Sequence, residues 1–117
     1  MAGKEFEEAM EKIITRAKTH PNDALSTDER ILLIKDRALA LIGIARQNGM
    51  VRDQTDFVTT IMALAMSAGI NAARFNISTK DLSVMLSNGV KYGETLLHAY
   101  NEDQLFTKMA KNPKGNA

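Results

Sequence analysis

The sequence lacks cysteine altogether, which excludes a disulfide framework, a thiol nucleophile and every cysteine-ligated metal or cluster site. It also lacks a charge imbalance, because fifteen basic and fourteen acidic residues leave a formal net charge of +1. A general nucleic-acid binder carries a large positive net charge and an acidic mimic of DNA a large negative one, so neither class fits this chain. A cysteine-free chain suits a reducing compartment, and the acidic N-terminal residues are not typical of a signal peptide, so we expect a cytoplasmic protein.

Helix breakers are scarce as well, because Pro21 and Pro113 are the two prolines of the 117-residue chain. Apolar residues recur at three- and four-residue spacing, and no alternating strand pattern competes with that spacing. Helices are expected over residues 4–19, 27–48, 53 or 55 to 68, and 78 or 79 to 88, with 92–111 forming one helix or two. The sequence thus predicts an all-α fold, a compact bundle of five to six helices. We expect this bundle to be a single domain over residues 1–111, followed by a disordered tail over 112–117.

The predicted helix ends carry specific signals. Ser26, with Glu29 three residues on, is typical of a capping box at the start of the second helix. Gly49, Gly69 and Gly89 each precede an apolar residue, which is typical of a Schellman stop and predicts short Gly-stopped turns. These glycines lie 20 residues apart, but their flanking residues share nothing else. Helix stops are therefore favoured over an internal repeat.

The longest window without a charged residue runs over residues 57–73. At 17 residues, and with several polar side chains, it is short for a helix that crosses a bilayer. We therefore expect a buried helix in this window and no membrane association.

No constellation in the sequence is typical of an enzyme. The seven glycines form no phosphate-binding loop, and no serine lies in a nucleophile elbow. Glu94, His98 and Glu102 are spaced by four residues, so a continuous helix would place two carboxylates and an imidazole on one face, as possible ligands for zinc or iron. A metal site needs three or four converging ligands, usually from more than one element, so a solvated helix face is favoured here. We expect no enzyme and no cofactor.

Nucleic-acid binding is the second class of function that the sequence raises. Residues 44–58 resemble the helix-turn-helix motif of bacterial repressors, since Ala45, Gly49, Met50 and Val58 match its small residue, its turn glycine and two core positions. Residues 82–96 resemble the same motif with two residues too many before the turn.

The resemblance implies a DNA-binding regulator, but the first stretch departs from the motif. Asn48 and Thr55 occupy positions that the family keeps apolar, and Asp53 and Asp56 would repel phosphates at the start of the reading helix. On this alternative, the basic residues nearest the two turns would contact phosphates. They are Arg46, Arg52, Lys80 and Lys91.

Protein binding is the third class and the one that the sequence favours. Residues 38–78 contain only five charged residues, so their helices have more apolar surface than a small bundle covers. Met62, Met66 and Met85 add pliable side chains to this surface. We expect a small non-enzymatic regulatory or adaptor protein that binds a protein partner, as a homodimer. Its expected interface comprises Ala40, Gly43, Ile44, Ile61, Met62, Ala65 and Met66.

Overall fold

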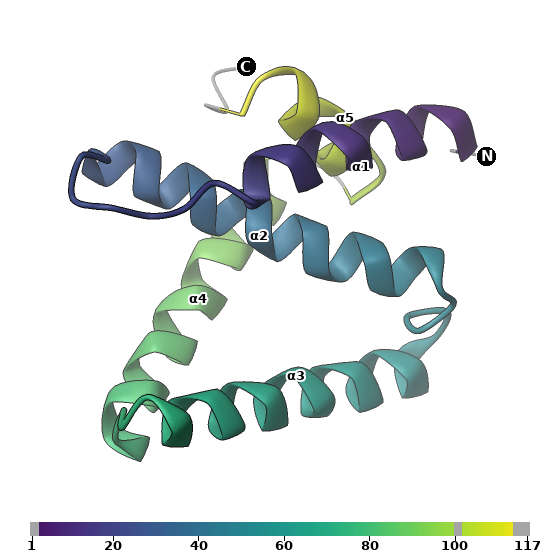
Figure 1. Cartoon of the computed structure of the whole chain (residues 1–117). Coiled ribbons are helices and arrows are strands. Elements are labelled where there is room, and N and C mark those ends of the chain that lie inside the picture. The colour runs from purple at the N-terminus through teal and green to yellow at the C-terminus, as the bar shows by residue number, and fades with distance from the viewer. Residues whose placement is uncertain (1–2, 100–101, 114–117) are drawn as a thin grey trace. The chain divides into compact units, whose positions relative to one another are not determined.

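A computed structural model of the chain describes residues 3–99 and 102–113, and the fold over these residues is all-α (Figure 1). Five helices make up about 80% of the described residues, which contain no strand. Contacts group the chain into two units, each of which is described by itself. Unit 1 comprises Met1–Ile44 and Tyr100–Ala117, and unit 2 comprises Ala45–Ala99.

Unit 1 is built on the pairing of helix α1 (Gly3–Ala17) with helix α5 (Glu102–Lys111). The apolar stripe predicted for the first helix is buried, and Met10 and Ile13 are 1% and 0% exposed. Phe6 meets Phe106 of α5 edge to face, with ring centroids 5.0 Å apart. This arrangement of aromatic rings adds to the free energy that burial of their surface contributes.

Helix α2 (Thr27–Gln47) begins with the predicted capping box. The Ser26 N–H donates to Glu29 Oε1 at 2.9 Å, and the Glu29 N–H donates to Ser26 Oγ at 3.1 Å, so two backbone donors are satisfied. Further along α2, Gly43 allows Met10 and Phe106 to approach its backbone. A Cβ built at Gly43 would overlap Met10 Sδ and lie 3.1 Å from Phe106 Cε1.

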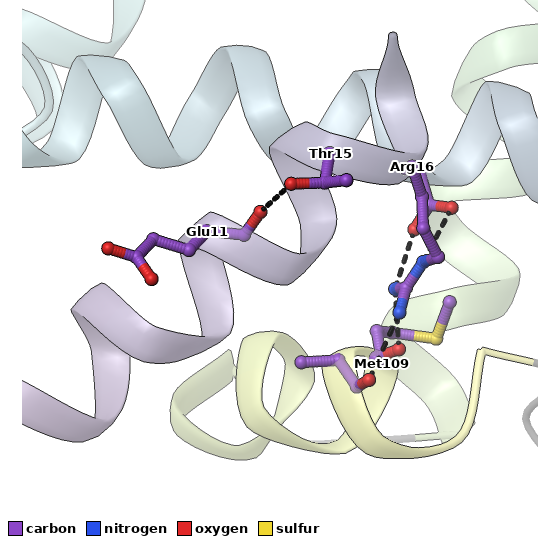
Figure 2. Close-up of polar contacts among 6 residues, drawn as sticks. Glu11, Thr15, Arg16 and Met109 are labelled. Atoms are coloured by element: carbon purple, nitrogen blue, oxygen red, sulfur yellow. Dashed lines mark hydrogen bonds and ion pairs between the residues drawn. The ribbon is translucent and has the colours of Figure 1, made fainter. Parts of the chain in front are cut away.

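Arg16 joins α1, α2 and α5 through four hydrogen bonds. Its Nε and Nη2 donate to the two carboxylate oxygens of Asp36 at 3.0 and 2.9 Å. Its Nη2 and Nη1 also donate to the carbonyls of Met109 and Ala110, at 2.8 and 3.0 Å (Figure 2). Asp36 is 3% exposed, so its charge depends on this guanidinium for compensation. The Arg16–Asp36 pair therefore fixes the last turn of α5 against the other two helices.

Unit 2 contains helix α3 (Gln54–Arg74) and helix α4 (Thr79–Ala99). Asp53 caps α3 by accepting the Asp56 N–H at 2.8 Å, and Ser78 Oγ accepts the Asp81 N–H at 3.1 Å at the start of α4. Asn76, at a φ of 58°, turns the chain between them. The two helices meet near this turn and separate beyond it (Figure 1).

Two of the three predicted glycine stops are wrong. Gly49 has a φ of 71° after α2 and confirms its stop, but Gly69 and Gly89 lie inside α3 and α4. The predicted helix ends at residues 68 and 88 are therefore corrected to helices that end at Arg74 and Ala99. An interior glycine costs about 1 kcal/mol, which does not end a helix whose apolar stripe continues beyond it.

The segment left open over residues 92–111 divides between two helices. Its first part is the end of α4, which reaches Ala99, and its second part is α5. Of the predicted disordered tail, residues 112 and 113 are described, and the Asn112 N–H donates to the Lys108 carbonyl at 2.8 Å. Residues 114–117 lie outside the described part of the chain.

Gly43→Ala tests the close packing in unit 1. Replacing an interior helical glycine with alanine ordinarily stabilises a protein by about 1 kcal/mol. Here we expect a loss of about 1–3 kcal/mol in the free energy of unfolding, because the new methyl group overlaps Met10. Urea denaturation followed by circular dichroism measures the change. In a Met10→Ala background the same substitution should lose its penalty, and a stabilised single variant would contradict the packing.

Arg16→Met tests the buried ion pair. We expect a loss of about 2–4 kcal/mol, because the buried Asp36 carboxyl group loses its partner. Adding Asp36→Leu should recover part of this loss. Arg37→Met is the control. In the part of the chain that the structure describes, the exposed Arg37 side chain donates to the carbonyls of Ala17 and Thr19. Replacing it should lower the free energy of unfolding by about 1 kcal/mol or less. Equal losses for the two arginine variants would show that Arg16 has no special role.

Candidate functional site

The most unusual feature of the structure is the apolar surface that unit 2 exposes. Among its described residues only Ala45 and Ala72 are buried. Thirteen large apolar side chains of α3 and α4 are at least 38% exposed, and together they are named the α3–α4 surface. They are Phe57, Val58, Ile61, Met62, Leu64, Met66 and Ile70 on α3, and Val84, Met85, Leu86, Val90, Tyr92 and Leu97 on α4. Soluble chains rarely leave so much contiguous apolar surface without a binding role.

The sequence of α3 explains how wide its part of the surface is. Val58, Ile61, Ala65, Ala68 and Ala72 repeat at three- and four-residue spacing and form one stripe. A second set, with Met62 and Met66 as its most exposed members at 66% and 71%, extends the stripe around the helix. Polar residues occupy the remaining arc. A helix with so wide an apolar face requires neighbours on more than one side.

The sequence of α4 is divided more sharply into two faces. Leu82, Leu86, Gly89, Gly93 and Leu96 follow one another at four- and three-residue spacing and mark the apolar face. The opposite arc, on which Val84 also lies, carries the polar and charged residues. They are Lys80, Ser83, Ser87, Lys91, Glu94 and His98.

The structure divides the predicted interface residues into two groups. Ile61, Met62, Ala65 and Met66 lie exposed along α3 in unit 2, and Ile44 is 42% exposed on α2. Ala40 is 8% exposed, and Gly43 packs against Met10 and Phe106. The last two residues therefore belong to the interior of the chain, because small residues on α2 let its neighbours approach closely.

Sequence reasoning missed most of the α4 half of this surface. The expected surface includes Met85 but not Leu86, Val90 or Leu97, and a helix that stops at Gly89 excludes the last two from the stripe. The signal that reveals them is the unbroken spacing from Leu82 to Leu96 through two glycines.

The residues predicted to contact phosphates do not form one basic patch. Lys80 and Lys91 are exposed on α4, about 16 Å apart along the helix axis. Arg52 Nε donates to Asp56 Oδ2 at 2.9 Å, and this hydrogen bond lowers the pKa of Asp56 and raises the pKa of Arg52. Arg46 is exposed at the end of α2. The guanidinium of Arg52, close to the first of the two turns, is thus already bound to the carboxylate of Asp56.

The two helix-turn-helix resemblances have different outcomes. Residues 82–96 lie entirely within α4, so this stretch contains no turn. Residues 44–58 do contain one, with Gly49 in the left-handed conformation, but residues 48–53 separate α2 from α3. The motif uses a turn of about three or four residues, so this connection is too long for it.

The candidate metal ligands are not on one continuous helix. Glu94 and His98 are exposed on α4, which ends at Ala99, and Glu102 begins α5. The spacing by four residues therefore no longer implies a shared face for Glu102. Over the described residues, no group of three or more histidine or acidic side chains is placed to hold a metal ion.

Two hollows lie in the described part of unit 1. One of about 260 Å³ lies between α1 and α5 and is lined by charged and small residues, including Glu5, Glu8 and Lys12. Another of about 190 Å³ is lined by Arg16 and Asp36, whose charged groups already bind each other.

Helix α3 meets the length and composition of a membrane-spanning helix. Its most apolar window has a mean hydropathy of 1.3 and is only 6% buried, whereas a buried helix was expected here. The expectation of burial within this chain is therefore wrong. A core helix of a soluble protein meets the same criteria, so length and composition alone do not assign the helix to a bilayer.

Comparison with known proteins gives no match, whether to a family model, a curated protein or a solved structure. The function proposed for this chain therefore depends on the chemistry of the α3–α4 surface.

Proposed function

We propose that the protein is a small cytoplasmic regulatory or adaptor protein that acts by binding protein through the α3–α4 surface, as a homodimer. The observation that carries this proposal is the contrast within the chain between a unit with buried apolar stripes and a helical hairpin with thirteen exposed large apolar side chains. Each such side chain gains about 1.5–3 kcal/mol when it is fully removed from water, so an occupant of this surface gains affinity from many small contributions.

The composition of the hairpin favours protein over nucleic acid as the occupant. Unit 2 contains five basic and four acidic residues, so its formal net charge is +1 with His98 neutral. Nucleic-acid affinity comes largely from neutralising phosphates, and this surface offers little charge with which to do so. Aromatic, methionine and aliphatic side chains, in contrast, are typical of the cores of protein interfaces.

The same composition favours protein over a lipid bilayer. A bilayer would accept α3, but α4 exposes apolar side chains as well and carries Lys91 and Glu94 near its middle. Helices that lie on a membrane surface usually combine an apolar face with a basic one, and the charges of α4 are mixed. A protein occupant is able to cover both helices while leaving the polar arc of α4 in water.

Methionine oxidation tests whether protein covers the surface. Met62, Met66 and Met85 are 55–71% exposed, whereas Met10 and Met109 are 1% and 0% exposed and serve as slow references. We expect hydrogen peroxide to oxidise the three surface methionines nearly as slowly as the references in a concentrated sample. On dilution their oxidation should become at least about fivefold faster, because access to the sulfur controls the rate. Peptide mass spectrometry measures each site.

Three outcomes of this experiment would contradict the proposal. Protection that persists at every dilution would mean that the chain covers its own surface. Fast oxidation at every concentration would mean that no second copy binds there. Protection that appears only with phosphatidylcholine–phosphatidylglycerol vesicles would assign the surface to a bilayer.

A further inference from the structure

No other part of the described chain exposes enough large apolar side chains to cover the α3–α4 surface. Among its described side chains, unit 1 exposes three that are large and apolar, Ile34, Leu41 and Ile44, all on α2. The hairpin exposes thirteen on its two helices. Three side chains are too few to cover thirteen, so the cover has to come from another molecule with a similarly wide apolar face.

The area available on the hairpin matches what a stable dimer needs. A large apolar side chain that is about half exposed presents on the order of 80 Å² to water. Covering about ten of the thirteen would therefore bury on the order of 800 Å² per chain, which is the size of a standard protein interface. One copy of the hairpin is thus large enough to cover another.

The charges of the hairpin permit it to face its own copy. Residues 57–73 of α3 and 82–90 of α4 contain no charged residue, so a self-contact over these segments buries no pair of like charges. The charged residues Lys80, Lys91 and Glu94 lie on the opposite arc of α4 and stay in water. An acidic or basic partner gains nothing from such a surface, whereas an identical uncharged surface is complementary to it.

Resting on the proposed function, we infer that the occupant of the α3–α4 surface is the same hairpin of a second copy, so that α3 and α4 of two chains form one four-helix core. Each α3 then has neighbours on several sides, as its wide apolar face requires. Unit 2 obtains in the dimer the core that it lacks in a single chain. A two-fold arrangement suits this contact, because the same patch serves both partners.

Charge-introducing variants of the full chain test which surfaces meet. Met66→Glu and Val90→Glu place a carboxylate on the apolar faces of α3 and α4, and each should raise the dimer dissociation constant at least about tenfold. Ser67→Glu is the matched control on the polar arc of α3, and Leu41→Glu is the control on unit 1. Both should change the constant less than about threefold. Sedimentation equilibrium measures the mass, and circular dichroism confirms the helix content of each variant.

Cross-linking of the unaltered protein gives a second measurement that does not depend on how a variant folds. In a mixture of ¹⁴N- and ¹⁵N-labelled chains, an amine-reactive linker should join Lys80 or Lys91 of one copy to Lys80 or Lys91 of the other. Intermolecular links from these residues to Lys35 of α2 would instead place unit 1 of the second copy on the hairpin.

The outcomes separate this inference from the proposed function. A dimer that Leu41→Glu dissociates, or that links Lys91 to Lys35, overturns the hairpin pairing and leaves a homodimer. A trimer or larger assembly overturns the four-helix core alone. A monomer at every concentration overturns both.

Discussion

The exposure of two long apolar helices is the constraint on which the rest of this structure depends. Helices α3 and α4 are 21 residues each, contact each other near one turn, and have one buried residue between them, Ala72, over their described side chains. Most helical stability in proteins comes from packing an apolar face rather than from helix propensity. Within this chain the hairpin makes few packing contacts of that kind, because Ala72 is its one buried residue among the described side chains.

Unit 1 shows what a satisfied core looks like in the same sequence. Met10 and Ile13 are fully enclosed, and Gly43 lets two side chains reach the backbone of α2. Arg16 compensates the buried carboxylate of Asp36 and also holds the end of α5. Over the described residues, no buried side-chain nitrogen or oxygen lacks a hydrogen-bond partner. The two units thus differ in burial. Helices α1 and α5 bury their apolar residues against each other, whereas α3 and α4 leave theirs exposed. The Arg16–Asp36 pair lies wholly within unit 1.

Local rules predicted the local features of this structure. The stripe of α1, the capping box at Ser26 and the stop at Gly49 depend on residues a few positions apart, so the sequence contains their whole cause. The Arg16 bonds to α5 join residues more than 90 positions apart, and no spacing rule reveals them. Gly69 and Gly89 were misassigned because a glycine marks a helix end only where the backbone adopts a positive φ. The helix end predicted at Gly89 left Val90, Tyr92 and Leu97 out of the surface, and the burial predicted for the charge-poor sequence of α3 was wrong.

Amide hydrogen exchange as a function of protein concentration tests the central claim most directly, because it reports the stability of each helix separately. If a second hairpin completes the core of unit 2, amides of α3 and α4 become more protected as the concentration rises. Those of α1 and α5 stay protected throughout, since their packing lies within one chain. Protection of α3 and α4 that is high and independent of concentration would contradict the account, because it would show that a single chain already covers them.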